Sequence, residues 1–256
     1  MLRFKQIINP IALRNNKRMN IITRMKSELK KAGNPRGFTL LELLIVISII
    51  AILSVALVLV LNPAETLKKA RDSQRIADLN TLKTALGIYV TSTTTPFLGS
   101  GTSNTLCKTT PSTAFGAGTF KIWYSVTATT TAVTDTALDT GTGGTTGQVA
   151  ATTASVTDGN GWIPVNLDTL TGGSPISNLP VDPVNTITDR ANVASSDLVY
   201  RYACSQTPLA FEIDSQLESS AFTVSDDKRA SDGGDSASYY EVGTNLKILT
   251  GTTAQF

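Results

Sequence analysis

The feature that most constrains this chain is an uninterrupted apolar run at residues 43–61, which reads LLIVISIIAILSVALVLVL. It contains nineteen residues, two of them serines, and no charged side chain. At about 1.5 Å per residue, a helix of this length is close to 30 Å long, which matches the hydrocarbon core of a bilayer. Since the run is apolar on every side, we expect it to form a membrane-inserted helix.

Charge is distributed unevenly on the two sides of this run. The chain has 22 Lys and Arg against 20 Asp and Glu, but residues 1–37 hold ten of the basic side chains and a single acid, Glu28, which gives +9. Residues 38–256 carry −7. Basic residues that flank a membrane helix stay on the cytoplasmic side. We therefore expect a single-pass protein of the cytoplasmic membrane with residues 1–37 inside and its C-terminal domain outside.

The residues around the run argue against an ordinary secretory signal. In that design a small-residue cleavage site follows the apolar segment, whereas here Asn62 and Pro63 follow it. A small residue, Gly37, instead precedes the run, within the motif RGFTLLE at residues 36–42.

This motif resembles the cleavage and methylation site of type IV prepilins and of the related type II secretion pseudopilins. The shared features are a basic leader ending in glycine, a phenylalanine after it, a glutamate at the fifth position beyond the glycine, and an apolar helix. The resemblance implies that a prepilin peptidase cuts after Gly37, removes residues 1–37 as a leader, and methylates the new amine of Phe38. Both Met1 and Met25 are possible starts of the leader.

Glu42 is the candidate assembly residue. A carboxylate in a membrane segment costs roughly 2.5–3.5 kcal/mol near the centre and less toward the edge, and it usually has a partner. The resemblance implies that this partner is the Phe38 ammonium of a neighbouring subunit, which sets the register of a growing filament. From the residues alone, two alternatives stay open: a favourable position in the first helical turn, and an ion pair with the chain's own Phe38.

Residues 64–90 have the period of an amphipathic helix. Pro63 is expected either to kink the helix or to begin a new turn, and residues 38–90 together are predicted to form one long helix, in lipid over its transmembrane first half (38–63). Four basic residues follow the apolar run: Lys68, Lys69, Arg71 and Arg75. A solvated helix face is the favoured interpretation of these four, and contact with lipid headgroups or an acidic neighbour is the alternative.

Composition changes at residue 91. Of the 70 residues in 91–160, 23 are Thr, 9 are Gly and five are charged. Within this segment, residues 119–127 alternate like a strand. Residues 127–148 have no helical period and too little bulk for a core, so they are predicted to be a surface insertion or irregular loop, with Thr-rich edge strands as the alternative.

Residues 161–256 are predicted to form a succession of short strands and turns. Strands are expected at 198–204, 209–214, 221–224 and 239–249. Consecutive short strands favour antiparallel pairing, so the fold class is α+β, with the long N-terminal helix packed on a C-terminal antiparallel β-sheet domain. The segment LPVDP at 179–183 is similar to the loop before a late strand in many pseudopilins.

Four aspartates form the densest polar cluster of the sequence: Asp226, Asp227, Asp232 and Asp235. Closely spaced carboxylates with flexible glycines suit Ca²⁺, and the resemblance also implies calcium, because some pseudopilins carry such a site in their C-terminal loops. The spacing does not match an EF-hand. A solvated loop is therefore the favoured interpretation, and no other cofactor is expected.

The two cysteines, Cys107 and Cys204, both face the oxidising side of the membrane under this topology. A disulfide between them is the favoured prediction, and it would pin the Thr-rich region to the strand at 198–204. Two separately buried thiols are the alternative.

The composition also limits the function. The chain has no His, which excludes a Ser–His–Asp triad and a His-ligated metal, and it contains no phosphate-binding loop or nucleophile elbow, so no enzyme is expected. The acidic body lacks a broad basic patch, so nucleic acid is not an expected partner.

The leading hypothesis is a structural subunit of a type IV pilus or a type II secretion pseudopilus, assembled with its own kind into a helical filament at the cell surface or in the periplasm. The resemblance implies three further partners: the prepilin peptidase and N-methyltransferase, an inner-membrane assembly platform, and a motor ATPase. The competing hypothesis is a membrane-anchored extracellular adhesin or ligand-binding domain that never assembles.

Overall fold

The computed structural model describes residues 37–113, 115, 120–126, 133–135, 145–147, 154–190, 193–194 and 196–249. Residues 1–36, with both candidate start methionines, and most of the predicted insertion at 127–148 lie outside the described residues. The chain divides into two compact units, Met1–Val60 and Leu61–Phe256. Each unit is described by itself.

The first unit is built around helix α2, Leu40–Leu61. Residues 40–58 of this helix are all exposed and form a largely apolar surface that no part of the described chain covers. The two hydroxyls of the run are satisfied internally, because Ser48 Oγ donates to the Ile45 carbonyl at 2.8 Å and Ser54 Oγ to the Ile50 carbonyl at 2.7 Å. Such internal pairing is what a helix in lipid requires, and α2 lies in the one stretch of the described residues that is helical, long and apolar enough to cross a membrane.

Helix α3, Pro63–Ser92, follows after a single residue, Asn62. Asn62 has φ 37° and ψ 70°, a left-handed conformation that asparagine tolerates better than most residues. Its carbonyl accepts from the amides of Glu65 and Thr66 at 3.1 and 3.2 Å, and Pro63 takes a first-turn position, where a missing N–H costs nothing. The helix predicted over 38–90 is thus interrupted at Asn62, and Pro63 begins a new turn.

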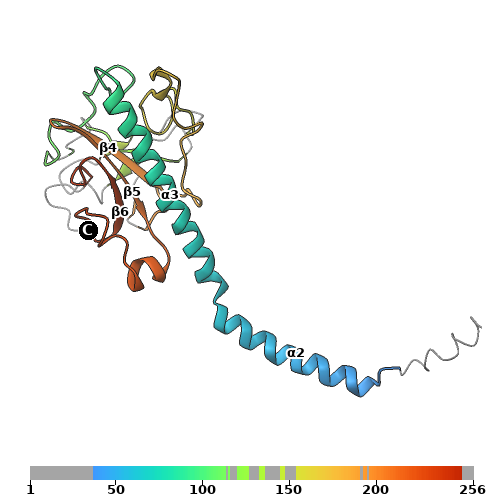
Figure 1. The fold of residues 1–256 in the computed structure, drawn as a ribbon. Coiled ribbons are helices and arrows are strands. Elements are labelled where there is room, and N and C mark those ends of the chain that lie inside the picture. The colour runs from blue at the N-terminus through green and yellow to red at the C-terminus, as the bar shows by residue number, and fades with distance from the viewer. Residues whose placement is uncertain are drawn as a thin grey trace, which may run out of the picture. The chain divides into compact units, whose positions relative to one another are not determined.

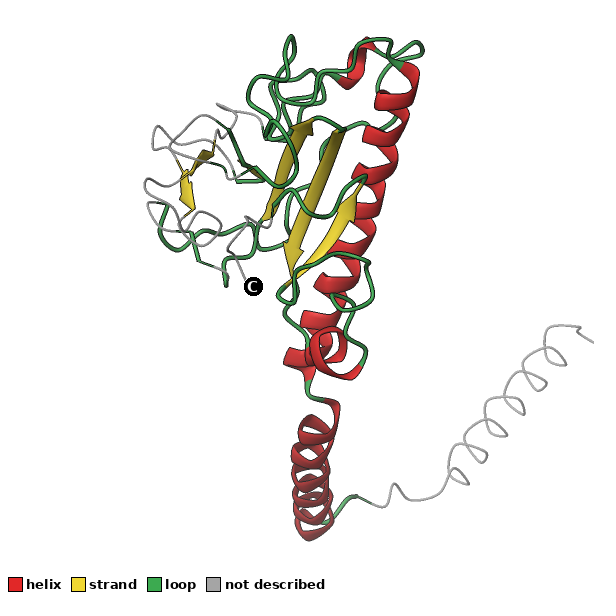
Figure 2. Ribbon diagram, turned by 90° about the vertical axis from the view of Figure 1, so that its left-hand side faces the viewer, coloured by secondary structure: helices red, strands yellow, loops and turns green. Residues whose placement is uncertain are grey.

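The second unit combines α3 with a four-stranded antiparallel sheet in the order β1-β4-β5-β6. The strands are β1 Trp123–Tyr124, β4 Tyr200–Gln206, β5 Leu209–Gln216 and β6 Tyr239–Gly243. Helix α3 lies across one face of this sheet (Figures 1 and 2). The α+β class, with a helix packed on an antiparallel sheet, is therefore confirmed.

The individual strand predictions fare differently. Those at 198–204 and 209–214 are confirmed by β4 and β5, and the last strand, predicted at 239–249, is confirmed over its first five residues. Of the strand predicted at 119–127, the described residues 120–126 form a strand only at Trp123 and Tyr124. The strand predicted at 221–224 is wrong: Ala221–Ser225 form a short π-helix, η2, because the preceding serines bond to carboxylates of α3 instead of to a neighbouring strand.

Two short strands, β2 Val133–Asp135 and β3 Thr145–Gly147, pair antiparallel in a sheet of their own. At these six residues the Thr-rich segment is a β structure, which was the second of its two interpretations. A 3₁₀ helix, η1 Leu167–Thr169, lies farther along and contacts α3.

Alternation along the strands separates two apolar clusters. On the face toward α3, aromatic and aliphatic side chains of β4 and β5 pack on Leu79, Leu82 and Leu86 of the helix and on the fully buried Trp162. The opposite face is covered by loops and by the segment that ends at Leu249. Burial of both faces lets this sheet carry charged side chains that never reach solvent.

Candidate processing and assembly site

The residues before α2 are irregular and exposed. Phe38 has 84% of its surface exposed, and a Cβ placed on Gly37 would meet no atom within 4 Å. Neither residue is therefore required by a contact of the described chain. The peptide bond between Gly37 and Phe38 lies in the open, where another protein can reach it.

Glu42 lies in the first turn of α2 and forms a reciprocal cap with Thr39. The Glu42 amide donates to Thr39 Oγ1 at 3.1 Å, while the Thr39 amide and hydroxyl both donate to Glu42 Oε2 at 3.2 Å. This is a capping box, which satisfies helix-terminal amides that otherwise lack partners. The structure thus favours the local first-turn interpretation for the uncleaved chain, in which Phe38 has no free amine.

Thr39 is a residue that the sequence interpretation missed. Its signal is present, because Thr-x-x-Glu before an apolar run is the usual sequence signature of a capping box. The cap uses one carboxylate oxygen, Oε2, for both of its contacts with Thr39. Thr39 consequently holds the orientation of the carboxylate that the resemblance assigns to assembly.

The comparison with protein families decides how this segment is interpreted. Residues 33–58 match the family model of the prokaryotic N-terminal methylation motif. The chain carries a prepilin-type N-terminus. This motif is the signature of type IV pilin and pseudopilin precursors, so the resemblance is confirmed for residues 33–58. No curated protein and no solved structure matches the chain.

Beyond the prepilin-type segment, the basic residues of α3 are not the solvated face that the sequence suggested. Arg75 is fully buried and makes a bidentate pair with Asp182, at 2.6 and 3.0 Å, and its Nη1 donates to Asp72 at 2.8 Å and to Glu218 at 2.6 Å. Arg71 also makes a bidentate pair with Glu218, at 2.8 and 2.7 Å. The prediction was therefore wrong for both arginines.

Burial by itself would lower the pKa of Arg75, but its hydrogen bonds and charge interactions with Asp182, Glu218 and Asp72 outweigh burial and raise that pKa. Arg71 and Arg75 in turn hold the pKa of Glu218 at about 2. Asp182 belongs to the LPVDP segment, so this network fastens α3 to the loop before β4. The network positions the outer domain on its helix.

Three of the four aspartates of the candidate calcium cluster bond to separate partners. Asp226 pairs with Lys228 at 2.6 Å, and Asp227 pairs with Arg229 at 2.9 Å. Asp232 accepts from the amides of Gly234 and Glu241, each at 2.8 Å. Asp235 lies in the same loop.

Among the described residues, no group of three or more acidic, Cys or His side chains is arranged to hold a metal ion. Calcium binding stays a prediction of the sequence alone. A melting temperature that rises with Ca²⁺ and falls with a chelator would support it, and an unchanged one would contradict it.

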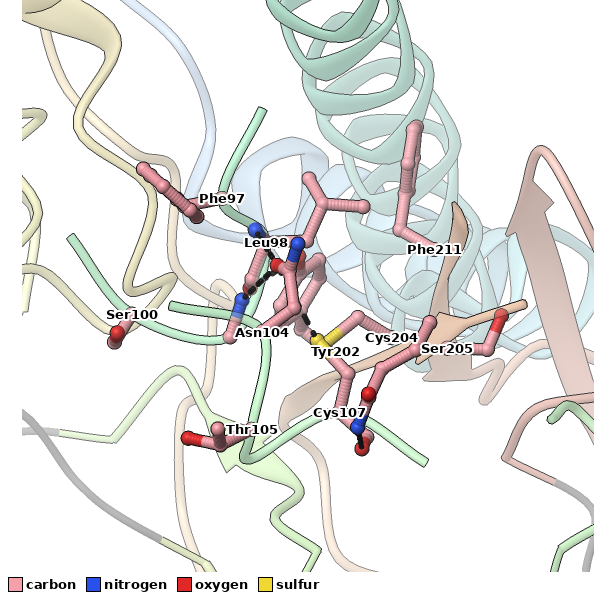
Figure 3. The surroundings of a disulfide bond; sticks show 12 residues. Phe97, Leu98, Ser100, Asn104, Thr105, Cys107, Tyr202, Cys204, Ser205 and Phe211 are labelled. Carbon is pink, nitrogen blue, oxygen red and sulfur yellow. Dashed lines mark hydrogen bonds between the residues drawn. A yellow bond between two sulfur atoms is a disulfide. The ribbon is translucent and has the colours of Figure 1, made fainter. Parts of the chain in front are cut away.

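Cys107 and Cys204 form a disulfide across a sequence separation of 97, with Cα atoms 4.7 Å apart (Figure 3). Cys204 lies on β4, and Cys107 precedes Lys108, whose amide donates to the Cys204 carbonyl at 2.9 Å. Asn104 fixes the approaching loop, because its Oδ1 accepts from the Leu98 amide at 2.6 Å. The bond attaches the start of the Thr-rich region to the sheet, as the first of the two sequence interpretations expected.

A buried polar group on the sheet face opposite α3 was not anticipated. Glu212 accepts from the amides of Ile248 and Leu249 at 2.6 and 2.8 Å, and Lys108 Nζ donates to the Ile248 carbonyl at 2.6 Å. Burial raises the pKa of Glu212, with Glu241 adding to the shift, and burial lowers the pKa of Lys108 to about 8. These hydrogen bonds hold Ile248 and Leu249, at the end of the described chain, against the sheet.

Proposed function

We propose that the chain is a structural subunit of a type IV pilus or a type II secretion pseudopilus. In this proposal a prepilin peptidase cuts after Gly37 and methylates the Phe38 amine, and the mature subunit assembles into a helical filament through α2. The observation that carries the proposal is the methylation motif at residues 33–58, which leads directly into a helix whose apolar surface is uncovered.

The uncovered surface of α2 supports assembly because it needs an apolar environment in every state of the protein. A bilayer provides one before assembly, and a bundle of the same helices provides one afterwards. Gly37 supports processing, because no contact in the fold requires a glycine at this position. Recognition by a peptidase would explain why a glycine is present. Glu42 supports register, because its carboxylate lies four residues from the amine that cleavage creates at Phe38.

The remaining parts of the proposal follow from the charge distribution around α2 and from the resemblance to prepilins. The subunit is anchored in the cytoplasmic membrane with its outer domain outside, and it later becomes part of a filament at the cell surface or in the periplasm. Its partners are further pilin-type subunits, the processing peptidase, an inner-membrane assembly platform and a motor ATPase. We propose no catalytic role, in keeping with a sequence that has no histidine.

Mass spectrometry of the N-terminal peptide tests the processing step. In cells that hold a prepilin peptidase, the peptide is expected to begin at Phe38 and to carry a methyl group. Gly37→Val is the matched variant, because the added side chain meets no atom near its Cβ and should block cleavage without disturbing the fold. An intact N-terminus in the wild-type chain would contradict the proposal and favour a plain membrane anchor.

Two substitutions of Glu42 separate assembly from helix capping. Glu42→Ala removes both the charge and the cap to Thr39, whereas Glu42→Gln keeps an oxygen that accepts from Thr39 and removes only the charge. If Glu42 pairs with the amine of a neighbouring subunit, both variants lose filaments in a shearing assay while processing continues. Filaments of wild-type yield from Glu42→Gln would show that only the cap matters.

A further inference from the structure

Residues 219–225 lie against the first turns of α3, at the end of the outer domain where the chain enters it (Figures 1 and 2). Ser219 donates to Asp72 Oδ2 through its amide at 2.7 Å and through its hydroxyl at 2.6 Å. Ser220 donates through its amide and its hydroxyl to Glu65 Oε1, the hydroxyl at 2.7 Å. Four hydrogen bonds therefore hold this segment at the beginning of α3.

The same end of the domain exposes apolar side chains. Val224, in η2, has 77% of its surface exposed, and Leu67, in the second turn of α3, has 62%. Within the described residues of the outer domain, the other large apolar side chains that are exposed, Ile88 and Val184, reach only 42% and 37%. The most exposed apolar groups of the domain thus gather where α3 begins.

Cations flank this apolar surface. Lys69 Nζ lies 5.5 Å from the centre of the Phe222 ring, and Lys228 Nζ lies 5.9 Å from it. Lysines of this kind rest their aliphatic stems on apolar surface and place the ammonium among polar groups. Lysines next to Phe and other apolar side chains are typical of protein segments that lie at the boundary between acyl chains and headgroups.

The chain itself limits how far this surface can lie from the membrane. Glu65 follows the last residue of α2, Leu61, by four residues, which span at most about 14 Å when fully extended. The headgroup layer is about 5–8 Å deep on each side of the hydrocarbon core. A segment bonded to Glu65 is therefore held at or near the depth of the headgroups whenever α2 spans the bilayer.

We propose that Lys69, Phe222, Val224 and Lys228 form an interfacial patch that contacts the phospholipid headgroups of the membrane spanned by α2. Val224 and Phe222 enter the boundary of the acyl chains, and Lys69 contacts the phosphates of an anionic surface. Lys228 lies beside them and pairs with Asp226 at 2.6 Å. The patch holds the outer domain against the membrane before assembly. This inference rests on the proposed function only in requiring that α2 be inserted.

Tryptophan quenching in lipid nanodiscs tests the patch on the full, uncleaved chain. Both native tryptophans are buried, Trp123 with 2% and Trp162 with 0% of its surface exposed, so lipid-borne quenchers do not reach them. Val224→Trp places a reporter in the patch, and Ser225→Trp, at the next exposed position, serves as a second reporter. Thr91→Trp is the control, because this exposed residue lies ~40 Å along α3 from Pro63.

In nanodiscs of brominated phosphatidylcholine and phosphatidylglycerol, the reporters at 224 and 225 are expected to lose emission relative to unbrominated lipid, while the control keeps its emission. Unchanged emission from both reporters would overturn the patch, and so would equal quenching of the control. A chain that does not enter nanodiscs at all would instead overturn the membrane anchor on which the proposed function depends. The two failures are therefore distinguishable.

Discussion

Removing the cation at the centre of the buried network should strongly destabilise the outer domain. Arg75→Met keeps a long side chain but leaves Asp72 and Asp182 buried beside it without the guanidinium that pairs with both. Removing one partner of a buried ion pair costs about 3–5 kcal/mol, because the remaining charge is neither solvated nor paired. For a domain of this size, about 2–4 °C of melting temperature corresponds to each kcal/mol, so the expected loss is between about 6 and 20 °C.

Arg71→Met is the matched control for this substitution. Arg71 lies one turn earlier on the same helix and also pairs with Glu218, but its side chain is 35% exposed. Water and salt weaken such a pair, which contributes about 1 kcal/mol at most, and the expected change is about 2–4 °C.

Both variants are melted as the full chain in detergent, with the disulfide intact, and unfolding is followed by the fluorescence of Trp162, which is buried in the core on the α3 face of the sheet. An Arg75→Met variant no less stable than Arg71→Met would refute the reasoning. It would mean that the carboxylates around Arg75 move into water or take up protons at little cost in free energy. They would then need a cation less than their burial in the native state suggests.

Three further predictions follow from the same contacts. Thr39→Ala should speed amide exchange in the first turn of α2 by removing a cap that contributes about 0.5–2 kcal/mol, and Thr39→Ser, which keeps the hydroxyl, should not. Replacing Cys107 and Cys204 together by Ala should cost about 2–5 kcal/mol, measured by urea unfolding, because the bond closes a long loop. The arginines beside Glu218 depress its pKa to about 2, so its contribution to stability is complete above about pH 4.5 and disappears as the pH falls toward 2; Glu218→Gln should flatten the dependence of melting temperature on pH in that range.

The N-terminal part of the molecule could be predicted from the sequence because few alternatives exist there. A nineteen-residue apolar run has one stable form in a membrane, and the motif before it locates Gly37, Phe38 and Glu42 by position alone. The helix break was also foreseeable at Pro63, although the residue that makes it is Asn62. These features depend on residues that are close together in the sequence, so they can be inferred from the sequence directly.

The errors arose where distant residues determine the outcome. Residues 221–224, AFTV, have the composition of a strand, but hydrogen bonds to Glu65 and Asp72, roughly 150 positions earlier, hold the preceding serines and leave no strand beside them. Arg75 looked like a solvated charge because its partner Asp182 lies 107 residues later. No local pattern indicates such a pair, which only the assembled fold brings together.

The disulfide makes a covalent ring of the chain from Cys107 to Cys204, and the Thr-rich sequence from residue 108 to residue 160 lies inside that ring. A protease that cuts within the ring leaves both fragments on one molecule, and only a reductant releases them. The ring also tolerates growth, because each doubling of a closed loop costs only about 0.6 kcal/mol. Sequence can therefore be inserted or cleaved in this region while β4 and β5 stay covalently joined to α3, which precedes the cut.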